Sequence, residues 1–370
     1  MNATFMTEYS TVAEKADYIG NLPRTEIPCQ EPAPRYRNGR PFQRTIALTT
    51  GRISNMRFTH CFALLCLVMT ACTPHGLQTT TGADASTHPL SGRIWDTQAQ
   101  RYITQPELEK KLRTARFVLL GEVHDNAGHH RLQRELVAAL LRDGRRPAIA
   151  MEQFDRDHQS AVERVRAART RDSEQIKKAG RFNDKGWNWS WYEPIVRLAL
   201  DHDLPLLAAN LSRTDAFRLS SAGIAAVLDA QTVTALNLNV PLPDAAQRNL
   251  EQAIADGHCG KAPPSMLPGI VTAQRTRDAL MAQALGRQSA AGAVLIAGNG
   301  HVRRDFGVPV YLAQYPGGED VIAVGLIETR PDEISPADYY GSGSPEYDFI
   351  SFTPATARED PCKDIRFKPR

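Results

Sequence analysis

The sequence lacks the features of a nucleic-acid-binding protein and of a membrane-spanning protein. Its 370 residues carry a formal net charge of only +3. No run of lysine and arginine stands out in the globular part, so composition does not support a nucleic-acid partner. No apolar segment is long enough to cross a bilayer, and we find no repeat of fixed period. The remaining composition, 42% hydrophobic and 23% charged residues, is that of an ordinary globular protein with ample length for a core.

A short apolar run near the N-terminus predicts export. Residues 61–71 are mainly apolar and follow Met56 and Arg57, which is the form of a secretory signal peptide with a positive start. The run ends in Met69-Thr70-Ala71-Cys72, which resembles a bacterial lipobox. We therefore predict a lipoprotein signal peptide over 56–71, with Cys72 as the lipidated first residue of the mature protein.

This prediction orders the rest of the N-terminal region. Residues 1–55 are interpreted as an upstream extension, because a complete signal begins at its own Met56. Residues 72–90 are rich in Thr, Ser, Gly and Ala and are expected to form a flexible tether. The expected location is the bacterial cell envelope, on the periplasmic face of the outer membrane, held by the lipid on Cys72.

Few cysteines remain once the leader is removed. Of the six, three lie before the predicted lipidation site and Cys72 would carry lipid. Cys259 and Cys362 then remain, and an exported compartment permits a disulfide between them. The sequence alone does not show whether they lie close enough to pair.

The chain is organised around one strand-to-helix junction. Phe117–Leu120 is a run of four apolar residues, typical of a strand buried on both faces of a parallel sheet. Gly121 allows a sharp exit, and Glu122 and His124 alternate, so they are expected to project to the same side. Leucines every fourth residue then predict a helix up to residue 142. Glu122 and His124 thus lie at the carboxyl end of a strand, where open α/β sheets bind ligands.

Further buried strands repeat this pattern. Buried strands are predicted at 148–151 and 293–297, a short edge strand at 93–95, and further strands at 204–209, 308–312 and 321–328. Glu152 follows the strand at 148–151, and His301 follows the strand at 293–297. The fold class is therefore α/β, a mainly parallel sheet flanked by helices, with a smaller helical subdomain. We assign the globular domain to 91–330, with the helical subdomain within about 159–290, and a surface tail to 331–370.

Four polar side chains from three strand ends are candidates for catalysis: Glu122, His124, Glu152 and His301. Two histidines with carboxylates suit a divalent metal that activates water, for which Glu122, His124 and His301 would be ligands. Without a metal, His124 is a candidate general base oriented by a glutamate. A buried polar network that ties the strand ends together is a third interpretation.

Several short motifs together resemble the ChaN family, bacterial haem-binding lipoproteins implicated in iron uptake, grouped with Tiki proteins and erythromycin esterases. The motifs are Gly121-Glu122-Val123-His124, Met151-Glu152-Gln153-Phe154-Asp155, Ala209-Asn210-Leu211-Ser212-Arg213, His258-Cys259-Gly260, Gln274-x-x-Arg277-Asp278 and Gly298-Asn299-Gly300-His301. The resemblance covers about 91–330. It implies an α/β sandwich with a largely helical subdomain, and a dimer that holds haem.

Haem requires an axial donor and an apolar slot. Donors are available at His258, Tyr192, Cys259, Met266 and Tyr311, and we predict His258 and Tyr192 as the axial ligands. The aromatic patch from Trp187 to Trp191 is a candidate wall of the slot, or a packed corner of the core. Arg213 and Arg277 are predicted to pair with the propionates, because arginine matches carboxylates bidentately. The expected function is haem or iron uptake by a membrane-anchored lipoprotein; a hydrolase and an interaction lipoprotein are the alternatives.

Overall fold

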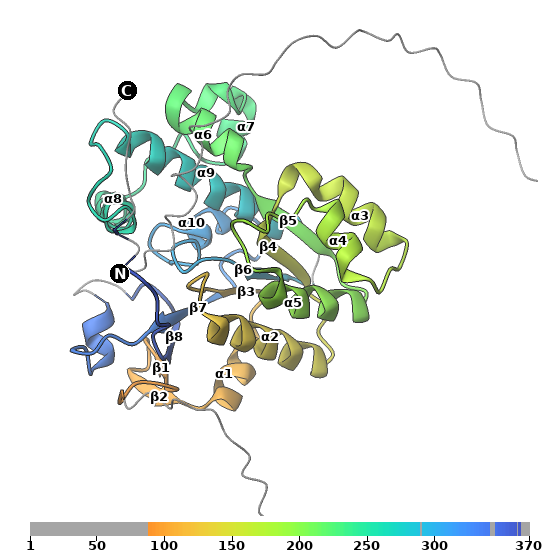
Figure 1. The fold of residues 1–370 in the computed structure, drawn as a ribbon, viewed down its shortest axis with the longest axis vertical. Coiled ribbons are helices and arrows are strands. Elements are labelled where there is room, and N and C mark those ends of the chain that lie inside the picture. The colour runs from red at the N-terminus through yellow and green to blue at the C-terminus, as the bar shows by residue number, and fades with distance from the viewer. Residues whose placement is uncertain (1–87, 289–290, 341–344, 361, 364–370) are drawn as a thin grey trace, which may run out of the picture. The chain divides into compact units, whose positions relative to one another are not determined.

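A sheet of eight strands separates two helical layers in the computed structural model (Figure 1). The structure describes residues 88–288, 291–340, 345–360 and 362–363. The predicted extension, signal peptide and lipidated Cys72, and the tether as far as residue 87, lie outside these residues. The strand order is β2-β1-β8-β7-β3-β6-β4-β5.

Most of this sheet is parallel. Strands β3 to β8 pair in parallel, whereas the hairpin β1–β2 is antiparallel and joins the sheet through β8. The strands are β1 (Ile94–Asp96), β2 (Arg101–Ile103), β3 (Phe117–Leu120), β4 (Ala148–Asp155), β5 (Leu206–Asn210), β6 (Ala293–Ile296), β7 (Val321–Glu328) and β8 (Phe349–Thr353). The α/β fold class predicted from the sequence is thereby confirmed.

Helices connect the strands on both faces. The α-helices are α1 (Gln105–Leu112), α2 (Ala127–Arg142), α3 (Gln159–Ala167), α4 (Ser173–Ala179), α5 (Trp189–Asp201), α6 (Arg213–Ala222), α7 (Ala230–Ala235), α8 (Asp244–Gly257), α9 (Leu267–Gly286) and α10 (Val308–Leu312). The short 3-10 turns are η3 (Arg156–His158), η4 (Ile224–Ala226) and η5 (Pro336–Tyr339).

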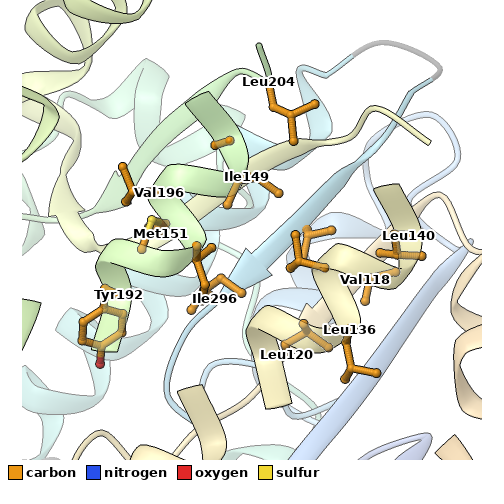
Figure 2. Packing of buried hydrophobic residues seen from close by; sticks show 14 of the residues in the cluster. Val118, Leu120, Leu136, Leu140, Ile149, Met151, Tyr192, Val196, Leu204 and Ile296 are labelled. Atoms are coloured by element: carbon orange, nitrogen blue, oxygen red, sulfur yellow. The ribbon is translucent and has the colours of Figure 1, made fainter. Parts of the chain in front are cut away.

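Alternating side chains of the strands divide the core between the two faces. Val118 and Leu120 of β3 pack with residues of α1, α2 and α5. Phe117 and Leu119 point the other way and pack with residues of α6, α9 and α10. Figure 2 shows the first of these cores, in which Leu136 of α2 lies among the side chains of the sheet. A strand with apolar residues on both faces is therefore buried from both sides, as its continuous apolar run predicts.

Side-chain caps fix where the helices begin. Thr104 and Glu107 form a reciprocal capping box at the start of α1. Asn126 accepts hydrogen bonds from the backbone N–H groups of Gly128 and His129 at the start of α2. The second cap places the first turn of α2 directly after the β3 strand end.

The helices α6 to α9 form the insertion between β5 and β6. Helices α6 and α9 cross closely at Gly269, where an added Cβ atom would lie 2.1 Å from the carbonyl oxygen of Ser220. The range of about 159–290 predicted as a helical subdomain also contains strand β5. Before β5 come α3, α4 and α5, which pack on the face of the sheet opposite to α6 and α9.

Two sequence-based predictions are wrong. Residues 308–312, predicted as a strand, form helix α10, in which Pro309 occupies the first turn, where its missing N–H costs no hydrogen bond. Residues 331–370, predicted as a surface tail, contain β8, which lies inside the sheet between β1 and β7. The side chains of Phe349 and Phe352 are buried there, which explains why this short segment joins the sheet.

Candidate functional site

The register of three neighbouring strands brings the sequence motifs to one edge. Leu120 of β3 pairs with Ile296 of β6, and Ile296 pairs with Met151 of β4. The residues that follow these three positions therefore lie side by side at the carboxyl edge of the sheet. Glu122, two residues after the end of β3, and Glu152, inside β4 just beyond its pairing with β6, flank the turn that carries His301 after β6.

Glu122 is the centre of the first polar cluster and is almost fully buried. Its carboxylate oxygen Oε1 lies 2.8 Å from Nδ1 of His124 and accepts a 2.6 Å hydrogen bond from the hydroxyl of Tyr192. Its Oε2 accepts a 2.9 Å hydrogen bond from Nε2 of Gln133 and lies 3.3 Å from Nδ1 of His130. Both oxygens are thus engaged by protein groups.

Electrostatics fixes the protonation of this cluster. Burial alone would raise the pKa of Glu122, but the adjacent His130 and His124 outweigh it and hold that pKa well below its usual range. Burial, with the neighbouring Glu122 charge, raises the pKa of Tyr192 well above its usual range. Glu122 is therefore an ionised acceptor, and Tyr192 is a neutral donor that does not ionise at physiological pH.

His301 is the centre of the second cluster and is only 1% exposed. Its Nδ1 lies 2.5 Å from Oδ1 of Asp278 and 3.0 Å from Nε2 of Gln274. Its Nε2 lies 3.3 Å from Oε1 of Glu152. The other oxygen of Glu152 accepts a 2.8 Å hydrogen bond from the backbone N–H of Gly298. The imidazole of His301 therefore bridges two carboxylates from β4 and α9.

The charges in this second cluster stabilise one another. Burial disfavours a charged imidazole, but Glu152 and Asp278 outweigh it and raise the pKa of His301 to about 10. Burial would raise the pKa of Glu152, yet His301 lowers it to about 2. Burial raises the pKa of Asp278 to about 6 despite the opposing His301. The result is a buried imidazolium between carboxylates.

Gly298 joins the two clusters. An added Cβ atom at this position would lie 2.9 Å from Cε1 of His124 and 3.7 Å from Oε2 of Glu152. The turn after β6 can therefore approach His124 this closely only because it carries a glycine, whereas its distance from Glu152 is an ordinary contact. The four residues predicted from the sequence as a catalytic set, Glu122, His124, Glu152 and His301, thus lie in two adjoining polar clusters, together called the strand-end network.

His129 and His130 hold the loop between β3 and α2 in place through hydrogen bonds. The backbone N–H of Val123 donates a 2.8 Å hydrogen bond to Nδ1 of His129, and Nε2 of His129 lies 2.7 Å from the hydroxyl of Thr353 in β8. Burial lowers the pKa of His129 to about 3, so this imidazole is neutral and donates from Nε2. His130 donates from Nε2 to the backbone carbonyl of His124 over 2.9 Å.

The sequence-predicted metal site receives no support from this geometry. Among the described residues, no group of three or more His, Cys, Asp or Glu side chains is placed to hold a metal ion. The reason is that the imidazole nitrogens face carboxylate oxygens at hydrogen-bond distance, instead of turning with them toward a common point. The predicted set Glu122, His124 and His301 is split between the two clusters, and the hydrolase alternative built on them is not favoured.

Aromatic side chains pack around the first polar cluster, the one centred on Glu122. The ring of Trp187 meets His124 edge-on, with centroids 4.6 Å apart, and Trp191 stacks on His130 at 5.2 Å. Trp189 donates from its indole N–H to Glu174. The aromatic patch therefore packs as a corner of the core around the polar network, which was one of its two sequence-based interpretations.

The predicted haem-binding residues are distributed over separate parts of the fold. Tyr192 lies on α5, which packs against α2 and α4, whereas His258 caps the end of α8, which packs against α9. His258 is 3% exposed, and its Nδ1 donates a 2.7 Å hydrogen bond to the carbonyl of Ile254. Arg277 is buried on α9, and Arg213 is the half-buried first residue of α6.

An apolar groove lies between the helices of the α6–α9 insertion and was not identified from the sequence. This helical groove has a volume of about 510 Å³. Its apolar lining residues are Ile224, Val233, Leu238, Pro264, Leu267, Pro268 and Val271. Arg275 lines the same groove and donates hydrogen bonds to the hydroxyl of Tyr311 and the carbonyl of Val240.

The fold and the strand-end motifs together define a known class of protein. Residues 108–312, more than half of the chain, match the family described as haem-binding uptake, Tiki superfamily, ChaN. The chain belongs to this family, as the motifs predict. A comparison with curated proteins gave no match.

A solved structure confirms the α/β fold. ChaN of Campylobacter jejuni, whose structure shows cofacial haem binding, is 21% identical and superposes with a TM-score of 0.55, covering 70% of this chain and 95% of that one. The type III effector HopBA1 is 11% identical with a TM-score of 0.37, covering 67% and 92%. The erythromycin esterase EreC in its open conformation is 14% identical with a TM-score of 0.35, covering 64% and 77%.

Proposed function

We propose that this protein binds haem and serves haem or iron uptake in the envelope of a bacterial cell. The observation that carries the proposal is the family match over residues 108–312. The structure of Campylobacter jejuni ChaN holds haem cofacially. We extend haem binding to this chain as a proposal, and with it the homodimer that the sequence resemblance implies.

The helical groove fits the chemistry of the macrocycle. A porphyrin needs an apolar slot, and seven apolar side chains line this groove. Its two propionates need cationic partners, and Arg275 lies in the lining. Two of the five guanidinium N–H donors of Arg275 are used in the described hydrogen bonds, to Tyr311 and Val240. The remaining donors suit a propionate.

His258 is the axial donor that we retain of the two predicted from the sequence. Its Nδ1–H donates to the Ile254 carbonyl, and a backbone carbonyl that fixes the tautomer in this way is typical of metal-bound histidine. His258 follows the last residue of helix α8 and does not itself line the groove, which α8 reaches with Gln247 and Glu251, 11 and 7 residues earlier. Tyr192 fits less well, because its hydroxyl is buried and bound to Glu122. Iron coordination by His258 requires the buried end of α8 to open.

A haem titration of the purified full chain in detergent, followed by absorbance, tests the proposal. We expect a Soret band that saturates at fixed stoichiometry. His258→Ala should shift or weaken this band, because an axial ligand is lost, whereas His202→Ala, at an exposed histidine at the end of α5, should leave it unchanged. Absence of a saturable Soret band would refute haem binding, and an unchanged spectrum of His258→Ala would remove this ligand.

We propose that the homodimer uses the helical face that carries the groove. Among the described residues, large exposed hydrophobic side chains include Phe217 of α6, 43% exposed, and Val240 beside Arg275, 53% exposed. Exposed apolar side chains favour a protein interface. Phe217→Glu should weaken a haem-dependent dimer in analytical ultracentrifugation. Ile334→Glu, at a residue 65% exposed elsewhere, is the control and should not.

Membrane attachment through Cys72 is also a proposal, supported by the lipobox-like motif. In the described part of the chain, no helix is both long and apolar enough to cross a membrane. Expression of Cys72→Ser in bacteria, followed by fractionation, is the test. The variant should move from the membrane fraction to the soluble fraction, and mass spectrometry of the parent protein should find lipid on Cys72. Membrane association that survives the substitution would argue against the lipid anchor.

A further inference from the structure

The segment that follows β8 crosses the carboxyl edge of the sheet. We call residues 354–360, together with Cys362, the strap. Near its start, the carbonyl of Pro354 accepts a 3.3 Å hydrogen bond from Nδ2 of Asn126. The backbone N–H of Thr356 donates a 3.1 Å hydrogen bond to Oε1 of Glu328. The strap backbone is therefore fastened to residues at the ends of β3 and β7.

Arg358 is the principal side-chain anchor of the strap. Its Nε and Nη2 each lie 2.8 Å from an oxygen of Asp125, and its Nη1 and Nη2 each lie 2.7 Å from an oxygen of Glu328. The guanidinium thus binds two carboxylates, each through two N–H donors. The Arg358 side chain is only 27% exposed, although it belongs to a surface segment.

A disulfide fastens the far end of the strap. Cys362 is bonded to Cys259, with their Cα atoms 5.8 Å apart and a sequence separation of 103. The ammonium group of Lys261 donates a hydrogen bond to the carbonyl of Cys362. The strap therefore runs from β8 to the end of α8 and is held at both ends.

The strap separates two pockets at the edge where open α/β sheets bind ligands. One pocket has a volume of about 850 Å³ and includes Ala355 and Thr356 in its lining. The other has a volume of about 440 Å³ and includes Ala355 and Arg358. Because Ala355 lines both, the strap is the wall between them.

We propose that the strap is a cover released by reduction, and that its release joins the two pockets into one crevice. While the disulfide is intact, Arg358 stays on Asp125 and Glu328. Reduction by a dithiol proceeds by exchange: the dithiol closes to its own disulfide, and Cys259 and Cys362 receive two electrons and two protons as thiols. The far end of the strap is then free.

The disulfide, more than the ion pairs of Arg358, determines whether the strap stays in place. The ion pairs of Arg358 are bidentate and partly shielded from water, yet they can break and re-form, whereas the covalent disulfide holds until it is reduced. A covalent bond keeps Arg358 close to its carboxylates whatever the strength of those pairs. Without the bond, the strap opens with the low local stability typical of a surface segment that has few buried contacts.

Hydrogen exchange of the full chain, with and without dithiothreitol, tests the proposal. In the reduced protein we expect exchange in residues 354–360 to rise by about tenfold or more, since local opening sets the exchange rate. Residues 125–131 and 326–330, which border the pockets, should follow. The double variant Cys259→Ser with Cys362→Ser should match the reduced protein and should not respond to dithiothreitol.

Further variants separate the two fastenings. Arg358→Gln with the disulfide intact should raise exchange less than reduction does. Arg101→Gln, which removes an exposed arginine paired with Glu107, is the matched control and should leave the strap unchanged. Unchanged exchange in 354–360 after reduction would overturn the proposal. So would faster exchange in the strap with no change in the residues that border the pockets. If the double variant fails to fold, the comparison of reduced and oxidised parent protein still decides.

Discussion

The strand-end network and the helical groove differ in burial, in polarity and in whether their polar groups already bind one another. The network contains the ionisable motif residues, yet its charged and polar groups are buried and already bind one another. The groove is open and mainly apolar, and of its charged lining residues, Glu251 and Arg275, the cationic Arg275 is the one toward which a propionate is proposed to turn. Residues that look catalytic in the sequence here hold strands together, whereas the residues suited to a large apolar ligand carry no motif.

This contrast separates stability from binding. A buried charge that is paired costs little until one partner is removed, so changes in the network should affect unfolding first. Changes in the groove should affect haem first, because its partly exposed side chains contribute less to the core. The four predictions below test this separation.

The largest effect is expected when the cation of the second cluster is removed. His301→Leu leaves Glu152 and Asp278 buried without their shared partner and should lower the free energy of unfolding by about 3–5 kcal/mol. Urea unfolding measures this loss. Arg101→Gln, which removes one partner of an exposed ion pair, is the control and should cost under about 1 kcal/mol. A loss of haem affinity in His301→Leu that remains fully folded would contradict the separation.

The same cluster predicts a loss of stability at high pH. The pKa of His301 rises from 6.5 to about 10 on folding, so its contribution is complete below pH 6.5 and disappears as the pH approaches 10. We expect the free energy of unfolding to fall by about 2–4 kcal/mol over this window. One pKa unit corresponds to about 1.4 kcal/mol, and the coupling of His301 to the buried carboxylates keeps the total below the product of this value and the full shift. Unfolding curves measured across the window test this, and the slope should flatten in His301→Leu.

A smaller loss is expected from Tyr192→Phe. The change removes one hydrogen bond to the ionised Glu122 and should lower the free energy of unfolding by about 1.5–3 kcal/mol. The Soret band of the haem complex should stay the same, because the hydroxyl belongs to the network. A shifted band would restore Tyr192 as an axial ligand, as the sequence predicted, and would place haem at the network.

The smallest change in free energy is expected in the groove. Val233→Glu puts a charge among apolar lining residues on α7 and should weaken haem binding by about tenfold, equivalent to about 1.4 kcal/mol. Stability should change by about 0.5 kcal/mol or less, because Val233 is partly exposed. Val165→Glu, at a half-buried valine on α3, is the matched control and should not affect haem. Equal haem affinity in both variants would remove the groove as the binding site.

Periodicity predicted most of the sheet, and its failures have physical causes. The buried strands β3 and β6 appear in the sequence as continuous apolar runs, because helices cover both of their faces. The error at 308–312 arose because an apolar run of five residues suits a strand or a helix equally, and Pro309 in the first turn decides for the helix. β8 was missed because its apolar residues lie within a polar, proline-rich region.

The candidate site was predicted only in part for a related reason. Strand ends brought Glu122, Glu152 and His301 to one edge, as alternation and sheet geometry require. Their partners come from helices: Asp278 from α9 and Tyr192 from α5. Gln274 and Asp278 share a helical face, a signal that was available, but no local pattern links a helix to a distant strand end. The sequence gives even less indication of the groove, because the apolar residues that line it cannot be distinguished in the sequence from core residues.

The position of β8 also sets an order for assembling the sheet. β8 is the only described strand that pairs with both the β1–β2 hairpin and the parallel sheet, which it joins through β7. During synthesis from the N-terminus, the hairpin can therefore dock only after residues 349–353 have emerged, more than 240 residues behind β2. Contacts of such long sequence separation form slowly. Until then, the edge of β7 and the β1 edge of the hairpin lack their neighbour, and an unpaired edge attracts other chains. A chain exported unfolded would need protection over this interval.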